Sequence, residues 1–267
     1  MEVNALTAEL CGIILGDGNL SRYLNRITIT GSSDDVVYFK HRVIPLFKKC
    51  FPQVNPMLFP VKNKKAYQLI VENKSIFNFF IERFGLQRGR KDTAHVPEVI
   101  VARKELIPHF LRGLFDTDGC FKFCKQAKSY SYYPRIRIAL MDSPIAHALQ
   151  ELLLTAGFDA RKHVRPNNGH GIKDLVQYEL SGVDAFERWM RVILPANPVQ
   201  IAKYLYWKEN GRHIPYLSLF ERLALIKDVE LVYDMIALTG FEPVSTGPKP
   251  AILSRLDDRA LHLFSTE

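Results

Sequence analysis

A short pattern occurs twice in this chain, and its repetition constrains the fold more than any other feature. The copies read LCGIILGDG at residues 10–18 and LRGLFDTDG at residues 111–119. Each is an apolar helical run that ends in Asp-Gly, and Asp17 lies 101 positions before Asp118, about the length of one small unit of helices and strands. The repetition predicts two similar halves that each bring one acid to a shared centre.

The segments that follow the two copies also match. Each copy leads into a strand of alternating polar and apolar residues, a helix, a second strand pair and a last helix. The matching segments are 26–30 and 135–138, 34–50 and 144–156, and 67–71 and 176–180. Short turns between neighbouring strands favour antiparallel pairing, so we expect an α+β fold of two αββαββα domains related by a pseudo-twofold axis.

The domain boundaries follow from the extent of the repeat. We expect a first domain at residues 1–100, a second at 101–207, and a helical C-terminal extension and tail at 208–267. Within this last part, residues 218–239 are typical of one or two helices, and residues 242–250 are typical of a linker. We expect a short helix or a frayed end at 251–267.

Small residues lie four positions apart in both motifs, at Gly12 and Gly16 and at Gly113 and Thr117. Small helix faces allow two helix backbones to approach closely, so the two motif helices are expected to pack together. Their C-terminal ends would then converge. A glycine follows the acid in each copy, and we expect Gly18 and Gly119 to end the helices in the left-handed conformation.

The paired acids are expected to destabilise the fold by themselves, and they are better explained as metal ligands. A carboxylate at a helix C-terminus lies beside the negative end of the helix dipole, which costs about 0.3–1 kcal/mol, and two such ends repel each other further. A divalent cation reverses the sign of these interactions. The expected ligands are the carboxylates of Asp17 and Asp118 with the backbone carbonyls of Gly16 and Thr117, a hard-oxygen set that suits two or more Mg²⁺ ions.

Composition narrows the class of protein. The net charge of +8 favours a polyanionic partner. Four cysteines without zinc-ligand spacing argue against a structural zinc site. Because the sequence shows neither a membrane-spanning run nor a signal peptide, we expect an intracellular protein, either cytoplasmic or organellar, that has no membrane partner and is not secreted.

The two motifs resemble those of the LAGLIDADG homing endonucleases in their single-chain, two-motif form, and the resemblance covers residues 5–207. It implies two antiparallel sheets that form a saddle over double-stranded DNA, and metal-dependent hydrolysis of both strands. Asp17 and Asp118 stand at the eighth motif position, where such enzymes hold their metal ligands. The first copy departs from the family pattern at Cys11 and Leu15, which do not carry the chemistry.

The resemblance also implies basic side chains near the scissile phosphates. Such residues lie outside the motif and are placed only by their position in the fold. Lys91 and Lys203 follow the last helix of each copy, and we take both as candidate catalytic residues.

The polar faces of the strands are the candidate DNA-binding surface. In the major groove, Arg bridges guanine O6 and N7, and Gln bridges adenine N6 and N7. The candidate DNA-binding residues are Tyr23, Asn25, Arg26, Thr28, Thr30, Lys62, Lys64, Gln68, Arg135, Arg137, Arg161, His163, Arg165 and Gln177.

The sequence therefore predicts an intron- or intein-type, site-specific endonuclease that acts as a monomer on a long asymmetric duplex. Two alternatives remain open at this stage. An RNA maturase that binds and helps to splice intron RNA would use the same fold and basic surface. A non-catalytic DNA-binding regulator on this fold is the second alternative, although both acids are present.

Overall fold

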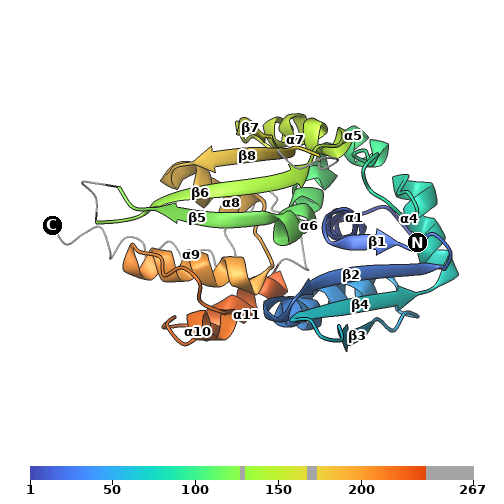
Figure 1. The fold of residues 1–267 in the computed structure, drawn as a ribbon, viewed down its shortest axis with the longest axis horizontal. Coiled ribbons are helices and arrows are strands. Elements are labelled where there is room, and N and C mark those ends of the chain that lie inside the picture. The colour runs from blue at the N-terminus through green and yellow to red at the C-terminus, as the bar shows by residue number, and fades with distance from the viewer. Residues whose placement is uncertain (127–129, 167–172, 239–267) are drawn as a thin grey trace.

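The structure is a computed structural model that describes residues 1–126, 130–166 and 173–238. Its two halves have the same element order and lie side by side (Figure 1). In the first half the elements are α1 (Ala5–Gly16), β1 (Gly18–Leu20), β2 (Arg26–Ser32), η1 (Ser33–Asp35), α2 (Val36–Tyr38), η2 (Phe39–Val43), α3 (Ile44–Cys50), β3 (Met57–Pro60), β4 (Ala66–Glu72) and α4 (Lys74–Phe84).

Two short elements, α5 (Glu98–Ala102) and η3 (Lys104–Leu106), connect the halves. The elements of the second half are α6 (Ile107–Asp118), β5 (Gly119–Cys124), β6 (Tyr133–Met141), α7 (Pro144–Thr155), β7 (Arg161–Arg165), β8 (Leu175–Ser181) and α8 (Val183–Val192). The order αββαββα expected from the sequence is thus found twice.

Each half contains one four-stranded antiparallel sheet, with strand orders β1-β2-β4-β3 and β5-β6-β8-β7. The strand registers also correspond. Gly18 pairs with Ile29 in the first sheet as Gly119 pairs with Ile138 in the second, and Gln68 and Gln177 occupy matching positions next to these pairs. The α+β fold and the repeat that the sequence predicted are confirmed.

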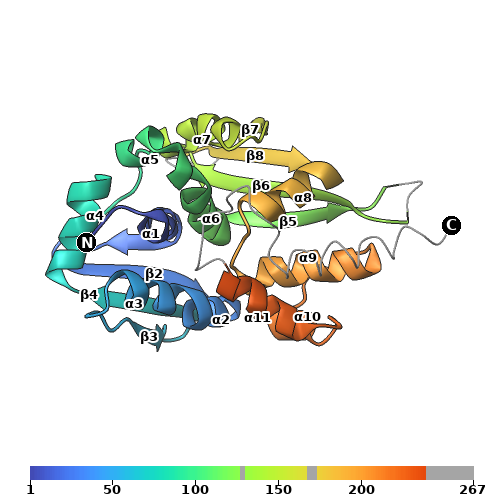
Figure 2. The same ribbon diagram turned by 180° about the vertical axis from the view of Figure 1, so that it is seen from behind.

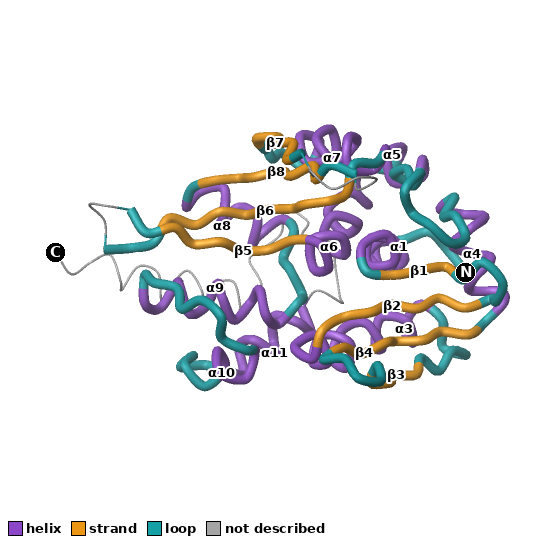
Figure 3. Tube along the Cα trace, in the orientation of Figure 1, coloured by secondary structure: helices purple, strands orange, loops and turns teal. Residues whose placement is uncertain are grey.

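One face of each sheet is covered by helices. In Figure 2, α2 and α3 cross the first sheet and α8 crosses the second, while α1 and α6 lie between the two sheets. Figure 3 shows the strands of both sheets exposed to the viewer on the opposite side. The alternation of each strand decides which face is covered, because Ile27, Ile29, Ile136 and Ile138 are buried toward the helices.

The chain after the repeat is helical, as expected, with α9 (Pro198–Asn210), α10 (Leu219–Leu223) and α11 (Val229–Leu238). Helix α11 packs against α9 and also reaches η2 of the first half, where the Tyr233 ring contacts His41 at 5.3 Å. The C-terminal helices therefore connect the two halves. The predicted linker at 242–250 and the short helix or frayed end expected at 251–267 lie outside the described residues.

The glycines after the acids differ from expectation. Gly119 has an extended backbone, with φ −97° and ψ 159°, and Gly18 is not among the residues with positive φ. They are needed for a close approach instead. A Cβ on Gly18 would lie 2.6 Å from the Cα of Ile14, and one on Gly119 would lie 2.1 Å from the Phe115 ring. The strand begins directly after the acid, which leaves no room for a left-handed cap.

In the described part of the chain, every helix is too short or too polar to cross a lipid bilayer.

Candidate active site and nucleic-acid interface

Helices α1 and α6 pack along each other through glycine. A Cβ on Gly12 would lie 2.2 Å from the Phe110 carbonyl oxygen, and a Cβ on Gly113 would lie 2.1 Å from the Glu9 carbonyl oxygen. Neither position has room for a side chain. The close packing of the two motif helices that the sequence predicted is therefore present, and it brings their C-terminal ends together.

Asp17 and Asp118 meet at these ends. Asp17 caps α1, and Asp118 is the last residue of α6. A Cβ on Gly16 would lie only 2.7 Å from Oδ2 of Asp118, which shows how closely the end of α6 adjoins the end of α1. The two acids expected to share a centre do so.

Loss of hydration and like charge raise the pKa of both carboxylates, although the Asp17 side chain is exposed. Loss of hydration, with the Asp17 charge as a smaller cause, raises the pKa of Asp118 from 3.8 to about 7. Asp17 is more exposed, yet partial desolvation and the nearby Asp35 carboxylate raise its pKa from 3.8 to about 6. Such a pair is poised to accept a cation, which offsets both the repulsion and the lost hydration.

Lys91 is the basic residue at the paired acids. Its ammonium donates to the carbonyl oxygens of Gly16 and of Leu15, the latter at 3.0 Å. Burial lowers the pKa of Lys91, while the charges of Asp118 and Asp17 act in the opposite direction. The side chain lies beside both carboxylates and is tethered to the end of α1.

Lys203 lies elsewhere. It projects from α9, where its ammonium donates to Oε1 of Gln200 at 3.3 Å. Burial lowers its pKa, and the charged neighbours that act on it are Cys120, Arg222 and Lys122 instead of the paired acids. Of the two candidate lysines, Lys91 therefore lies beside the acids, whereas Lys203 lies on α9, which packs against β5.

Of the two predicted carbonyl ligands, that of Gly16 already has a partner. The Gly16 carbonyl oxygen accepts from the Lys91 ammonium. The Thr117 side chain is held within its own helix, where its hydroxyl donates to the carbonyl oxygens of Leu114 at 2.9 Å and Gly113 at 3.2 Å, and these bonds leave its predicted carbonyl ligand untested. Among the described residues, no three side chains of His, Cys, Asp or Glu come close enough together to hold a metal ion.

A pocket of about 460 Å³ opens beside the acids. Asp118, Lys91 and Gly16 lie on one wall, and the end of β6 and the start of α7, including Asp142 and Ser143, lie on another. The carboxylate of Asp118 and the side chain of Lys91 therefore face a space that is large enough for small groups and water.

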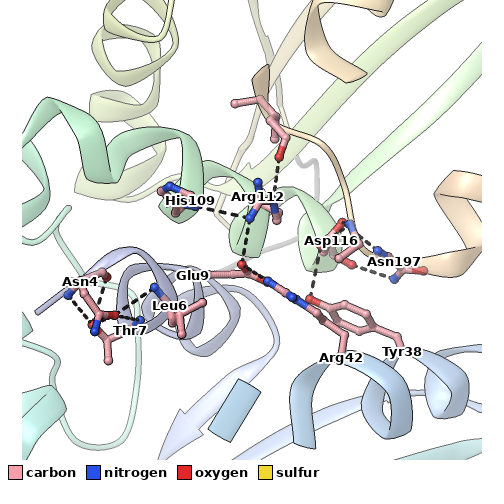
Figure 4. A network of polar contacts seen from close by, with 12 residues as sticks. Asn4, Leu6, Thr7, Glu9, Tyr38, Arg42, His109, Arg112, Asp116 and Asn197 are labelled. Carbon is pink, nitrogen blue, oxygen red and sulfur yellow. Dashed lines mark hydrogen bonds and ion pairs between the residues drawn. The ribbon is translucent and has the colours of Figure 1, made fainter. Parts of the chain in front are cut away.

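A buried ionic network holds the two halves together behind this centre (Figure 4). Glu9 of α1 binds Arg42 of η2, with Nε to Oε1 at 2.6 Å, and Arg112 of α6 at 3.1 Å. Arg112 also donates to the Ile193 carbonyl oxygen at 2.7 Å. The two arginines hold the pKa of Glu9 below its usual value, against the effect of burial.

Asp116 anchors the segment that leads to α9. Its carboxylate accepts from the backbone amides of Ala196 and Asn197, and it lies 3.5 Å from the Tyr38 hydroxyl of the first half. The side-chain amide of Asn197 donates to the Asp116 backbone carbonyl at 2.9 Å and to Oδ1 of Asp35 at 3.3 Å. Asn197 thus connects α6 to Asp35, the acid that raises the pKa of Asp17.

The predicted DNA-binding residues of the first half lie on the uncovered face of its sheet or in its loops. Thr28, Thr30 and Gln68 share that face, and Gln68 lies 3.4 Å from the Thr30 hydroxyl. Tyr23, Asn25, Lys62 and Lys64 are exposed in the turns, with Tyr23 85 % exposed. Arg26 is half-buried and forms an ion pair with Glu72.

In the second half, some of the predicted DNA-binding residues are exposed on a strand and others form ion pairs with an acid. Arg161, His163 and Arg165 are fully displayed on β7. Arg135 and Arg137 both bind the Glu179 carboxylate, at 2.6 and 2.7 Å.

Gln177 is the exception among these residues. It lies at the matching position to Gln68 but is only 2 % exposed, so a base cannot reach it in this conformation.

Sequence reasoning missed several of these partners. Glu179 was read only as part of a strand, although its place opposite Arg137 follows once the strand register is known. Asp35 and Asn197 gave no signal, because they lie far apart in sequence and meet only through the packing of the two halves. Glu9 precedes the first motif within an apolar run, and an acid at such a position is itself a sign of a buried ion pair.

Part of the chain matches a known protein family. Residues 105–190, which contain the second motif and the second sheet, match the model of the LAGLIDADG-like domain. The chain carries a LAGLIDADG-like domain. The first half has the same element order and the same strand register as this LAGLIDADG-like domain.

Two curated relatives show the extent of the sequence similarity. The ribonucleoside-diphosphate reductase NrdEB subunit alpha of Bacillus subtilis (strain 168) is 28 % identical over 162 residues, which cover 56 % of this chain and 14 % of the relative. The replicative DNA helicase DnaB of Synechocystis sp. is 28 % identical over 173 residues, covering 61 % and 19 %. The chain therefore spans less than a fifth of the length of these relatives.

Among solved structures, the homing endonuclease I-DmoI in complex with DNA and Ca is similar to this chain. The match has 17 % sequence identity and a TM-score of 0.45, and it covers 71 % of this chain and 89 % of the other.

Proposed function

We propose that this protein is a site-specific endonuclease that uses divalent metal ions to cut both strands of a long, asymmetric DNA duplex. The observation that carries this proposal is the meeting of Asp17 and Asp118 at the ends of two packed helices, between two sheets whose uncovered faces lie on the same side. Acids that repel each other at a desolvated helix junction destabilise the fold unless they serve a bound cation.

The residues present fit Mg²⁺. This ion is usually held by one or two carboxylates, and it keeps waters or takes phosphate oxygens for its other positions. Asp17 and Asp118 supply two carboxylates, whose pKa values are raised mainly by loss of hydration and then by a neighbouring acid, with Lys91 acting in the opposite direction. When bound, the metal would activate a water molecule and neutralise charge on the phosphodiester oxygens.

The chain's own residues supply the remaining functions in this proposal. Lys91, held beside both acids, stabilises negative charge on the scissile phosphate. The basic side chains of the two sheets and their turns contact DNA phosphates and bases. Because the halves differ at most exposed positions, the target is asymmetric.

We further propose that one chain is sufficient, since both acids come from the same polypeptide. A chain that acts on DNA works where DNA is kept, in the cytoplasm or in an organelle. The first experiment is incubation of the purified protein with a randomised duplex library and Mg²⁺, followed by sequencing of the cut ends. We expect paired cuts on both strands within one recovered sequence.

Variants of the acids test the assignment directly. Asp17→Asn and Asp118→Asn should each abolish cleavage while leaving duplex binding within a few-fold of wild type. Asp184→Asn is the matched control, because this exposed acid lies in the first turn of α8, away from the paired acids. Undiminished cutting by both active-site variants would exclude the proposed role of these acids.

A further inference from the structure

The uncovered faces of the two sheets carry different chemistry at equivalent positions. The registers place Met57 opposite Ile70 as they place Arg161 opposite Glu179, and Phe59 opposite Gln68 as His163 opposite Gln177. The equivalent residues in the first and second sheet are Met57 and Arg161, Phe59 and His163, Ile70 and Glu179, and Thr28 and Arg137. At these four positions the first sheet is mostly apolar, and the second sheet is mostly charged.

The first sheet displays its apolar side chains to solvent. Phe59 is 47 % exposed and Met57 is 39 % exposed, although both are large apolar residues on an edge strand. Half-buried Ile70 lies directly beside Met57 on the same face, and Thr28 lies opposite Ile70. Together Met57, Phe59, Ile70 and Thr28 form what we call the methyl-rich face.

The second sheet displays donors and charges at the same places. Arg161 and His163 are exposed on β7, and Arg137 is held in position by the Glu179 carboxylate. Since Glu179 also binds Arg135, this face is a fixed array of guanidinium groups around one acid. The two halves would therefore discriminate between bases by different physical means.

Base edges in the major groove offer a partner for each surface. The thymine C5-methyl group is the apolar feature there, and Phe and Thr methyl groups contact it. Guanine presents two acceptors, O6 and N7, that a guanidinium bridges with two hydrogen bonds. An apolar face therefore favours thymine, and an arginine-rich face favours guanine.

Charge around the methyl-rich face favours DNA over a protein partner. The turn that joins β3 to β4 carries Lys62, Lys64 and Lys65, all exposed, directly after the strand that bears Phe59. Three lysines at the end of an apolar strip match a duplex, whose phosphates flank the groove in which the bases are exposed. The same lysines would repel the equivalent strand of a second copy.

We propose that the two halves read half-sites of opposite composition. The methyl-rich face selects thymines through Met57, Phe59 and Ile70, and the second sheet selects guanines through Arg161 and Arg165. This inference rests on the proposed function, because it assigns the base preference of the same DNA-binding surface.

The test begins with selection of bound duplexes from a randomised library by the full chain carrying Asp17→Asn, so that bound DNA stays uncut. We expect one half of the selected sequence to be rich in thymine and the other in guanine. Each selected thymine of the first half is then replaced by uracil, which lacks only the methyl group. Binding should weaken about threefold to tenfold for this half-site, and the same replacement in the other half should have no effect.

Variants connect this preference to the residues. Phe59→Ala should remove most of the difference between thymine and uracil, and Met57→Arg with Phe59→His should shift the selected half-site toward guanine. Phe220→Ala is the matched control, because this ring is 67 % exposed on α10, outside both sheets. It should leave the discrimination unchanged.

The possible failures are distinguishable. If no duplex is retained, the proposed function itself is wrong. If duplexes are retained but neither half is thymine-rich, or uracil binds as well as thymine, DNA binding stands and this inference falls. If Phe59→Ala leaves the thymine preference intact and instead dissociates a dimer in sedimentation, the face is a protein interface and the inference is equally wrong.

Discussion

Gly12 of α1 and Gly113 of α6 each lie against the backbone of the other's helix, so that an added Cβ would come within 2.2 Å of Phe110 O in one case and 2.1 Å of Glu9 O in the other. Carbon and oxygen atoms do not approach so closely without a bond. The separation of the two helices, and with it the separation of the two acids, is therefore set by these glycines.

Replacement of either glycine by alanine should force the helices apart. We expect Gly12→Ala and Gly113→Ala each to lower the free energy of unfolding by about 1–3 kcal/mol, measured by urea denaturation, and to reduce cleavage because Asp17 and Asp118 separate. Gly85→Ala is the comparison. A Cβ there meets nothing within 4 Å, so the variant is destabilised only by the strain of an alanine at a φ of 67°. Equal losses in all three variants would mean that helix approach is not the cause.

Glu9 is the carboxylate that two buried arginines share. We expect Glu9→Gln to cost about 3–5 kcal/mol of unfolding free energy, because it removes the charge that compensates Arg42 and Arg112. Glu72→Gln breaks the more exposed pair with Arg26 and should cost less than about 1 kcal/mol. Similar losses in both variants would show that burial of the network does not matter.

His109 should make stability depend on pH. Burial and the neighbouring Arg112 charge lower its pKa from 6.5 to about 4, so the unfolded chain binds the proton first as pH falls. The stabilisation is complete above about pH 6.5 and is lost progressively toward pH 4. Between pH 7 and pH 5, wild type should lose about 2 kcal/mol more than His109→Asn in urea titrations. Parallel losses would contradict the assignment.

Lys91 and Lys203 should differ in their effect on cleavage. Lys91→Met removes the cation beside both acids and should slow cleavage about 100-fold in single-turnover assays, with little change in duplex binding. Lys203→Met serves as the matched control and should leave the cleavage step nearly unchanged, because this side chain pairs with Gln200. A larger effect at Lys203 would reverse the assignment.

Metal binding should stabilise the folded protein. At millimolar Mg²⁺ we expect a higher Tm than in EDTA, because a ligand that binds only the folded state shifts the unfolding equilibrium. The double variant Asp17→Asn with Asp118→Asn removes the expected ligands, and its Tm should be the same in both conditions. A Mg²⁺-dependent rise that survives in the double variant would place the ion elsewhere.

The sequence was sufficient for the fold because every signal was local and occurred twice. The alternation around Ile27 and Ile136 and the small residues Gly12 and Gly113 each predicted a contact that the structure contains. It also predicted that Asp17 and Asp118 meet, since both end helices with matching faces.

The sequence could not predict contacts between segments that do not occupy equivalent places in the two repeats. In chain order, Lys91 comes after α4 and Lys203 comes after α8, the corresponding helix of the second half. The segment at Lys91 turns back over the end of α1, whereas Lys203 lies in α9, which runs along β5. The burial of Gln177 and the pairing of Glu179 with two arginines depend on side-chain packing across strands, on which periodicity carries no information.

The glycine contact between α1 and α6 uses backbone atoms of these two helices, whereas Met57 and Arg161 lie on the edge strands of the two sheets. Substitutions on Met57 or Arg161 therefore leave the geometry of the acids untouched. If the proposed function holds, each half can acquire a new target preference by mutation independently of the other half and without loss of the paired acids, so that such a chain can follow a drifting genomic sequence one half at a time.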